Sequence, residues 1–165
     1  MSVVLRPAVP EDLPFLTGGD SPFDDFGPRP ARTEVYSPRL DAPGGLIVAG
    51  PAGEVLGNVS WIYLQWGPNS ASRNPMIGIW LAEAARGRGY GTLAQRMLVD
   101  LLFRHTPCNR VEAGTDVANV VEQRSLEKVG LQREGVVRGA QWRDGAYRDM
   151  WLYSILRSEW TPLDS

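Results

Sequence analysis

One segment near the middle of the chain constrains the fold more than any other, because an apolar strand, a glycine-rich turn and an amphipathic helix follow one another there. The predicted strand is Met76–Leu81 and runs directly into the turn Arg86–Gly91, which has glycines at 87, 89 and 91. Apolar residues then recur at helical spacing over residues ~91–105. The helix is expected to end before Pro107.

A glycine-rich turn between a strand and a helix presents several backbone N–H groups at the positive end of the helix, where an anion such as pyrophosphate can be held. The three glycines lack the spacing of dinucleotide-binding turns, and no Gly-Lys-Ser/Thr follows as in nucleotide triphosphate loops. Both of those phosphate classes are therefore disfavoured. From the turn alone, an ordinary glycine-rich connection is as good an interpretation as an anion site.

The N-terminal part of the chain is less regular. Val3–Arg6 predicts a short strand, and Pro10–Leu16 predicts one or two helical turns. Residues 18–44 contain so many glycine and proline breakers that long regular elements are excluded, and we expect a long loop with at most one short helix. A loop of this length in a compact domain is more often a binding segment or lid than filler.

The remaining elements are signalled by turn and cap residues. We expect a hairpin from Leu46–Ala49 and Val55–Gln65, a strand at Arg110–Thr115, a helix at Asn119–Val129 capped by Asn119 and ended by Gly130, and a last hairpin over 131–156 that turns at Asp144-Gly145. Hairpins at both ends and helices between strands predict an α+β fold, with a mixed, mostly antiparallel sheet flanked by helices. Residues 1–165 are expected to form a single domain.

Composition narrows the class of function. The chain is 43% hydrophobic and 22% charged, and no apolar stretch approaches the ~20 residues of a membrane span. The N-terminus does not resemble a secretory signal, so we expect a cytoplasmic protein. A net charge of −2 disfavours a nucleic-acid partner. With one cysteine, Cys108, and one histidine, His105, no metal site is expected.

The segment from Ile77 through the turn to Thr92 resembles the acetyl-CoA motif of the GNAT superfamily, Gln/Arg-x-x-Gly-x-Gly/Ala, with Arg86, Gly89 and Gly91 at the three defined positions. Arg124–Leu131 is similar to the next helix of that family, and Glu134–Arg138 with Asp144-Gly145 to its closing hairpin. The resemblance covers residues ~46–157 and is closest to the branch that contains the ribosomal-protein N-terminal alanine acetyltransferases. It implies a GNAT-like fold in which the fourth and fifth strands splay apart.

The resemblance also implies a set of acetyl-CoA contacts. In the family the pantetheine arm lies between the splayed strands, and the glycine turn holds the pyrophosphate. The residues implied here are Trp80, Leu81, Ala82, Arg86, Gly87, Arg88, Gly89, Tyr90, Gly91, Thr92 and Asn119. Arg88 is equally well explained as a solvated surface arginine, and Asn119 as a helix cap, although the two roles of Asn119 are compatible.

Two departures from the family pattern concern catalysis. Leu126 stands where many GNAT enzymes have a tyrosine that protonates the departing CoA thiolate, and Glu122 stands where the nearest branch often has a serine. Glu122 is therefore a candidate acid or base. The Asn-x-x-Glu spacing is also a capping pattern, and we favour that structural interpretation. A thiol of reference pKa ~8.5 is a tolerable leaving group, so a missing acid does not imply lost activity.

The acceptor must be a neutral amine when it attacks, which favours an α-amino group of pKa ~8 over a lysine of pKa ~10.4. Tyr63, Trp66 and Trp142 are aromatic candidates for an acceptor pocket, and loop 18–44 is expected on the acceptor side, although strand aromatics are more often core. We predict an N-acetyltransferase that acts by direct attack on acetyl-CoA, with a protein or peptide N-terminus as acceptor. A small-amine or antibiotic acetyltransferase and a non-catalytic acyl-CoA-binding module remain alternatives, and the oligomeric state, homodimer included, stays open.

Overall fold

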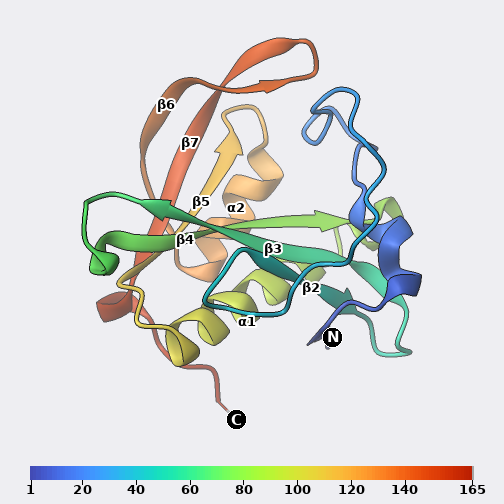
Figure 1. Cartoon of the computed structure of the whole chain (residues 1–165), viewed down its shortest axis with the longest axis horizontal. Helices are drawn as coiled ribbons and strands as arrows, with labels where there is room; N and C mark the ends of the chain where they lie inside the picture. Colours follow the sequence, from blue (N-terminus) through green and yellow to red (C-terminus); the bar gives the residue numbers. More distant parts are fainter. Residues whose placement is uncertain (165) are drawn as a thin grey trace.

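The computed structural model describes residues 1–164, and a seven-stranded sheet in the order β1-β2-β3-β4-β5-β7-β6 runs through it (Figure 1). The strands are β1 (Val4–Arg6), β2 (Gly44–Ala49), β3 (Val55–Gln65), β4 (Arg73–Leu81), β5 (Arg110–Asp116), β6 (Gln132–Arg143) and β7 (Ala146–Leu156). All neighbours in the sheet are antiparallel except β4 and β5, which are parallel. The predicted mixed, mostly antiparallel sheet is thus confirmed.

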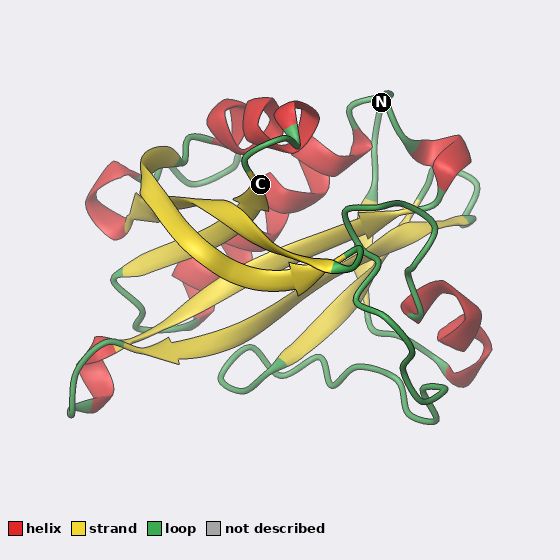
Figure 2. Cartoon of the chain, turned by 90° about the horizontal axis from the view of Figure 1, so that it is seen from above, coloured by secondary structure: helices red, strands yellow, loops and turns green. Residues whose placement is uncertain are grey.

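The two α-helices lie along one side of the sheet, and the long loop lies along the other (Figure 2). The helices are α1 (Tyr90–His105) and α2 (Val120–Val129), with short 3-10 segments η1 (Pro10–Leu16), η2 (Ser70–Ser72), η3 (Glu83–Ala85) and η4 (Arg157–Glu159). Leu98 and Leu102 of α1 and Leu126 of α2 are fully buried against the sheet. Within residues 1–164, no helix combines the length and the apolar character that crossing a bilayer would require.

The pairing of β4 with β5 is short, and this shapes the centre of the molecule. Only Met76 and Ile77 of β4 pair with β5, at Glu112 and Ala113. Both strands continue beyond this point, β4 to Leu81 and β5 to Asp116. The two strands therefore separate towards their carboxyl ends and leave a gap, as the resemblance implied.

Most local expectations hold, with small shifts of the boundaries. Strand β4 begins at Arg73, three residues before the predicted start, and η3 separates it from the glycine turn, so the strand does not run directly into the turn. Asp144 and Gly145 both have positive φ, 50° and 72°, as a type I′ turn requires. No helix or strand occurs between residues 17 and 43.

The core covers one side of α1. Ala94, Leu98 and Leu102 are fully enclosed, together with Gln95, Val99 and Phe103, and Leu93, Met97 and Leu101 are partly buried against the same core. The helical spacing of apolar residues over this segment is thus confirmed. The buried side also contains a glutamine, Gln95, which faces α2.

Candidate functional site

The glycine turn is built for a close backbone approach. Gly87 and Gly89 adopt φ values of +70° and +82°, in the left-handed region that side chains rarely tolerate. Gly89 is the N-cap of α1, and the first intrahelical bond runs from the amide of Leu93 to the carbonyl of Gly89. The amides of Tyr90, Gly91 and Thr92 precede that bond and have no partner within the helix. They form the kind of cradle that binds an anion at a helix N-terminus.

Gly91 brings the start of α1 close to the end of β4. A Cβ atom at this position would lie 3.3 Å from Leu81 Cδ1 and 3.5 Å from Ile79 Cδ1. The absence of a side chain therefore allows the helix terminus and the strand to meet. The anion cradle and the gap-lining strand form one continuous surface as a result.

Hydrogen-bond alternation decides which backbone groups of β4 face the gap. The amide of Ala82 donates to Leu56 on β3 at 2.9 Å, and its carbonyl accepts from Ala85 at 2.9 Å. Bonded pairs alternate along an antiparallel ladder, so Trp80 also points its backbone groups towards β3.

The backbone groups of Leu81 and Ile79, at the intervening positions, point towards β5 and the gap. For backbone contacts across the gap, this register favours Ile79 and Leu81 over Trp80 and Ala82. The expected contacts of Trp80, Leu81 and Ala82 with acetyl-CoA stay a prediction.

The side chain of Arg86 ties together three parts of the chain. Its Nε donates to the carbonyl of Leu81 at 2.9 Å, and its Nη2 contacts both carboxylate oxygens of Asp20 at 2.6 and 2.7 Å. Trp80 Nε1 also donates to Asp20, at 3.1 Å. Burial opposes ionisation of Asp20, but the bonds from Arg86 and Trp80 hold its pKa below the ordinary value. These bonds hold the long loop against the glycine turn Arg86–Gly91.

The other side chains around the turn have local partners. The guanidinium of Arg88 lies 5.3 Å from the ring centroid of Tyr90, and the Tyr90 ring is buried in the core. The hydroxyl of Thr92 bonds to Ser125 of α2 at 2.8 Å. Any phosphate contact by Thr92 must therefore compete with or extend this bond between the helices.

Asn119 and Glu122 begin helix α2 at the carboxyl end of β5. Asn119 accepts a hydrogen bond from the Glu122 amide at 3.3 Å, so its capping role is confirmed. The Glu122 side chain does not return to Asn119 as a capping box requires. It accepts instead from Gln95 Nε2 on α1. The capping-box bond expected of the Glu122 carboxyl is thus replaced by a bond to the neighbouring helix, and whether Glu122 is structural or catalytic stays a prediction.

Glu122 has the properties of a group that titrates near neutral pH. Burial raises its pKa to about 7, and the hydrogen bond from Gln95 limits the rise. A carboxyl with this pKa can both accept and release a proton under ordinary conditions. Leu126, at the position of the family tyrosine, is fully buried in the core and has no polar group.

The tip of the β6–β7 hairpin rises beyond the rest of the sheet and meets the long loop (Figure 1). Arg143 Nη1 donates to the carbonyl of Pro22 at 2.7 Å, and the amide of Asp144 donates to the carbonyl of Asp25 at 2.8 Å. Arg143 is also paired with Asp116, the last residue of β5.

Both members of the Arg143 and Asp116 pair are buried. Burial would raise the pKa of Asp116, but bonds from the Ala118 amide and Arg143 hold it below the ordinary value. Arg143 thus fixes the loop, the hairpin and the end of β5 together.

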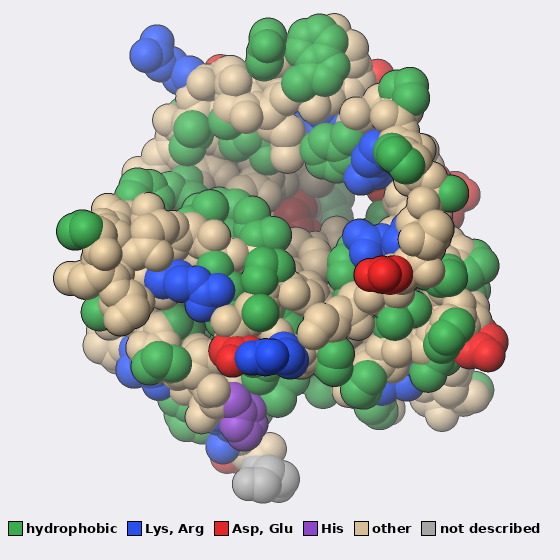
Figure 3. Space-filling view, in the orientation of Figure 1, with side chains coloured by type: hydrophobic (Ala, Val, Ile, Leu, Met, Phe, Trp, Pro, Cys, Tyr) green, Lys and Arg blue, Asp and Glu red, His purple; other side chains and the backbone are tan. Residues whose placement is uncertain are grey.

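A hollow lies between the hairpin, the loop and the strands β3 and β4, and acidic atoms are visible inside it (Figure 3). Nearby, a pocket is lined by Gly19, Asp20, Ser21, Pro22, Asp25 and Asp144. Three of these six residues are aspartates. Loop residues 19–25 and the hairpin tip therefore line an open depression next to the end of β4, in which Asp20 is paired with Arg86 and Asp144 with Arg148.

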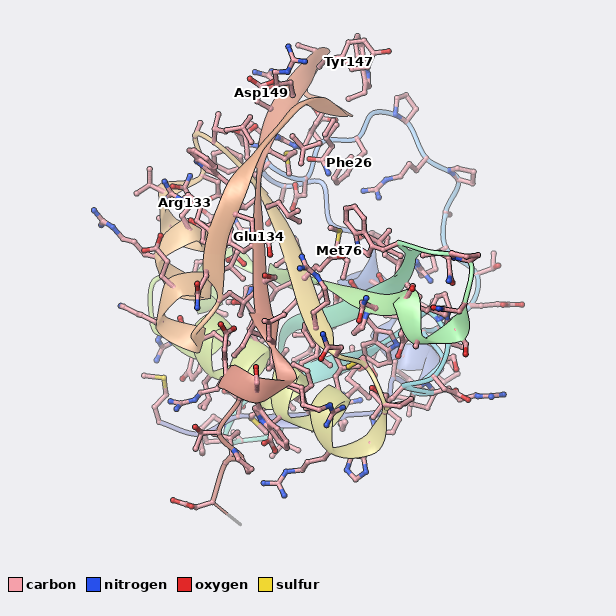
Figure 4. The ribbon with its side chains drawn as sticks, turned by 90° about the vertical axis from the view of Figure 1, so that its left-hand side faces the viewer. Phe26, Met76, Arg133, Glu134, Tyr147 and Asp149 are labelled. Atoms are coloured by element: carbon pink, nitrogen blue, oxygen red, sulfur yellow. The ribbon has the colours of Figure 1, made fainter. Side chains whose placement is uncertain are left out.

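The three aromatic candidates do not form one pocket. Tyr63 donates its hydroxyl to Leu40, and its ring is covered by Arg73 at 3.7 Å. Trp66 shares its Nε1 hydrogen between both oxygens of buried Glu112, at 3.1 Å each. Trp142 is 54% exposed and packs edge-on against Tyr147, which lies at the far tip of the hairpin (Figure 4).

Strand register measures how far apart these aromatics are. Glu112, the partner of Trp66, is level with Ser154 of β7, and Trp142 is level with Tyr147. Seven residues at about 3.3 Å each separate the two levels by roughly 23 Å. Trp66 and Trp142 are therefore too far apart to line one small pocket together, and acceptor contact by any of the three aromatics stays a prediction.

Several residues of this region escaped the sequence analysis. Asp20 and Arg143 have no local signal, because their partners are far away in the chain. Gln95 had one: it lies four residues before Val99 on a helix that is otherwise apolar on its buried side. A glutamine in such a stripe needs a polar partner. No group of three or more potential ligands for a metal ion occurs among the described residues.

Comparisons with known proteins agree with this geometry. Residues 2–132 match the acetyltransferase (GNAT) domain family. The Bacillus subtilis protein named "Putative ribosomal N-acetyltransferase YdaF" is 32% identical over 92 residues, which is 56% of this chain and 50% of that protein. The chain therefore spans about half the length of the curated relatives it matches.

Two solved structures show the same fold. RimJ of Mycobacterium smegmatis, in complex with CoA-disulfide, superposes with a TM-score of 0.64 at 27% identity over 72% of this chain and 55% of that one. Spermidine N-acetyltransferase of Vibrio cholerae, with CoA and spermine, superposes with a TM-score of 0.75 at 19% identity over 95% and 96%. Because the family match covers most of the sequence and the parallel strands separate beside the glycine turn, this chain belongs to the GNAT acetyltransferase family.

Proposed function

We propose that this chain is an acetyl-CoA-dependent N-acetyltransferase of the cytoplasm whose acceptor is the N-terminal amine of a protein or peptide. The observation that carries the proposal is the gap between β4 and β5, which opens beside the unpaired amides of the α1 N-terminus. The cradle suits the pyrophosphate of acetyl-CoA, and the gap suits its extended arm. The names of the relatives, which include a ribosomal N-acetyltransferase, support the acceptor class.

The residues of the chain fit this donor. The amides of Tyr90, Gly91 and Thr92 would hold the pyrophosphate, and the gap-facing backbone of Ile79 and Leu81 would hold the pantetheine arm. A gap-facing N–H would also donate to the thioester oxygen and stabilise the charge that develops there. Acetyl-CoA supplies the acyl group when it is bound.

Glu122 is proposed as the group that moves the proton. In the transfer a C–N bond forms and the C–S bond breaks, while the amine nitrogen loses one proton and the thiolate of CoA gains one. With a pKa of about 7, the Glu122 carboxylate is suited to take the proton from the amine and to return it to the sulfur, directly or through water. Leu126 cannot contribute, because its side chain has no ionisable group.

A second acceptor class is favoured by one observation. The pocket between the loop and the hairpin tip is lined by Asp20, Asp25 and Asp144. A polyamine carries several cationic groups and would be attracted to such an opening more strongly than a peptide with one amine. One solved structure of the same fold contains spermine, although at 19% identity it supports the fold alone.

Acetyl-CoA-dependent thiol release in the presence of different amines tests the proposal. Peptides with free N-termini, the same peptides with blocked N-termini, and spermidine would be compared at equal concentration. We expect turnover with the free peptides and none with the blocked ones. Turnover with spermidine alone would select the polyamine alternative. Tight acetyl-CoA binding without thiol release for any amine would indicate an acyl-CoA-binding module.

A further inference from the structure

A polar network crosses the otherwise apolar contact between α1 and α2. The Thr92 hydroxyl bonds to Ser125 at 2.8 Å, Ser125 donates to Gln95 Oε1 at 3.2 Å, and Gln95 Nε2 donates to Glu122. Gln95 is only 1% exposed, and fully buried Leu98 is its neighbour on the same helix. A buried amide in such a place is costly unless both of its ends are bonded.

The network fixes the direction of each hydrogen bond. A carboxylate only accepts, so the Gln95 NH₂ group must face Glu122 when Glu122 is ionised, and the amide oxygen must then face Ser125. Ser125 has one hydrogen and donates it to Gln95, so Thr92 is the donor to Ser125. Thr92, just after the glycine turn, and Ser125 therefore hold the amide of Gln95 in one orientation.

We propose that Gln95 is a positioning residue for acyl transfer: it holds the Glu122 carboxyl in a single orientation, and Thr92 and Ser125 hold Gln95. The inference rests on the proposed function, because Glu122 is the proton carrier of that proposal. Gln95 touches neither reacting atom and acts only through Glu122. The bond favours the ionised form of Glu122, so its loss should raise the pKa further.

Other charges do not explain the state of Glu122. The elements that pack against α2 are α1, β5 and β6. On α1, Asp100 pairs with Arg104, and Arg96 lines a separate pocket beside Asp100. On β5 and β6, Arg110 pairs with Glu112 and Glu134, Asp116 pairs with Arg143, Arg133 bonds to Gln123 and Glu127, and Arg138 is exposed. Among residues 1–164, the only hydrogen bond to the Glu122 carboxyl comes from Gln95.

Gln95→Met tests the inference, because methionine keeps the length of the side chain and removes the amide. We expect kcat to fall about tenfold with the acetyl-CoA Kd unchanged within about twofold, and the pH limb due to Glu122 to move up by about one unit. In a Glu122→Gln background the same substitution should change kcat less than about twofold, since the group through which it acts is gone. Equal losses in both backgrounds, or an unmoved pH limb, would overturn the proposal.

Two further measurements keep the test decisive. Ser125→Ala leaves Gln95 in place but removes the donor to its oxygen, so it should give a smaller change in the same direction even if Gln95→Met does not fold. Carbon-13 NMR titration of the Glu122 carboxyl reports the pKa without any turnover. If the wild-type chain acetylates no amine, the proposed function fails, whereas a Glu122 pKa that is the same with and without the Gln95 amide refutes the inference itself.

Discussion

The proposed donor side and the proposed acceptor side of this protein are assembled in different ways. The donor side consists of β4, the glycine turn and the start of α1, which follow one another in the chain and present mainly backbone groups. The acceptor side consists of loop residues 20–25, Asp116 and the hairpin tip at Arg143 and Asp144, which are held together by side chains across long sequence separations. The first is set by local conformation, and the second by a few long-range bonds.

Gly89→Val should give the largest effect, because it breaks the donor side at its most constrained residue. Valine is strained at a φ of +82°, and its Cβ would lie 3.1 Å from Met1 Cε. We expect acetyl-CoA affinity, measured by calorimetry, to fall about hundredfold or more while the chain stays folded. Gly53→Val is the matched control, since Gly53 has the same φ in the β2–β3 turn with no atom near its Cβ. Equal affinity losses in both variants would refute the assignment.

Glu122→Gln should come next, and it tests whether the proton carrier belongs to the donor side. General acid or base catalysis contributes about 10²–10⁴-fold, so we expect kcat to fall about hundredfold and one limb of the pH profile to disappear. Acetyl-CoA affinity should stay within about twofold. An unchanged kcat would show that the Glu122 carboxyl serves only the contact between α1 and α2.

The stability of the same variant against pH gives an independent check. The Glu122 pKa is raised from 4.5 to about 7 by folding, so the protonated form is favoured in the folded state. The resulting stabilisation is fully present below pH ~4.5 and is lost as the pH rises to ~7. Glu122→Gln should remove this dependence. The free energy of unfolding, measured with denaturant at pH 4, 6 and 8, should therefore fall less with rising pH for the variant than for the wild type. Parallel pH dependences of the two proteins would contradict the raised pKa of Glu122.

Arg143→Ala tests the proposed acceptor side. It leaves buried Asp116 without its cation and releases the Pro22 carbonyl, so the free energy of unfolding should fall by about 3 kcal/mol. The acceptor KM should rise about tenfold with the acetyl-CoA Kd nearly unchanged. Arg148→Ala is the comparison variant, because it removes hydrogen bonds to Arg143 and Asp144 within the hairpin turn but leaves the bonds of Arg143 to Pro22 and Asp116 in place. A parallel loss of donor affinity would show that the two sides are not separable.

Asp20→Asn should have the smallest effect, and it tests the ion pair between Asp20 and Arg86 that joins the two sides. Without the charge of Asp20, Arg86 is more available to a donor phosphate, while the loop is held less firmly. A part-exposed pair contributes at most about 1 kcal/mol, so we expect acetyl-CoA to bind about threefold tighter and the acceptor KM to rise about threefold. Asp41→Asn, in an exposed pair with Arg39 of the same loop, should change neither value. Weaker donor binding in Asp20→Asn would mean that Asp20 orients Arg86.

The sequence by itself determined the parts that depend on neighbouring residues. The glycines of the turn, the Asn119 cap, the Gly130 terminus with its φ of +108° and the Asp144-Gly145 turn were all predicted, because each needs a particular residue type at one backbone conformation. The gap between the fourth and fifth strands followed from the resemblance to a family. These features account for the turn and the helix start of the proposed donor side.

Tertiary structure alone decided the rest. Whether Ile79 or Trp80 turns its backbone to the gap depends on the register of β4 against β3, and a shift of one residue would reverse it. The Glu122 carboxyl bonds to Gln95 instead of its own helix cap because α1 is rotated to bring that amide against α2. Arg143 meets Pro22 across 121 positions of sequence. Such contacts leave no local pattern, since their free energy depends on partners that only the folded chain brings within bonding distance.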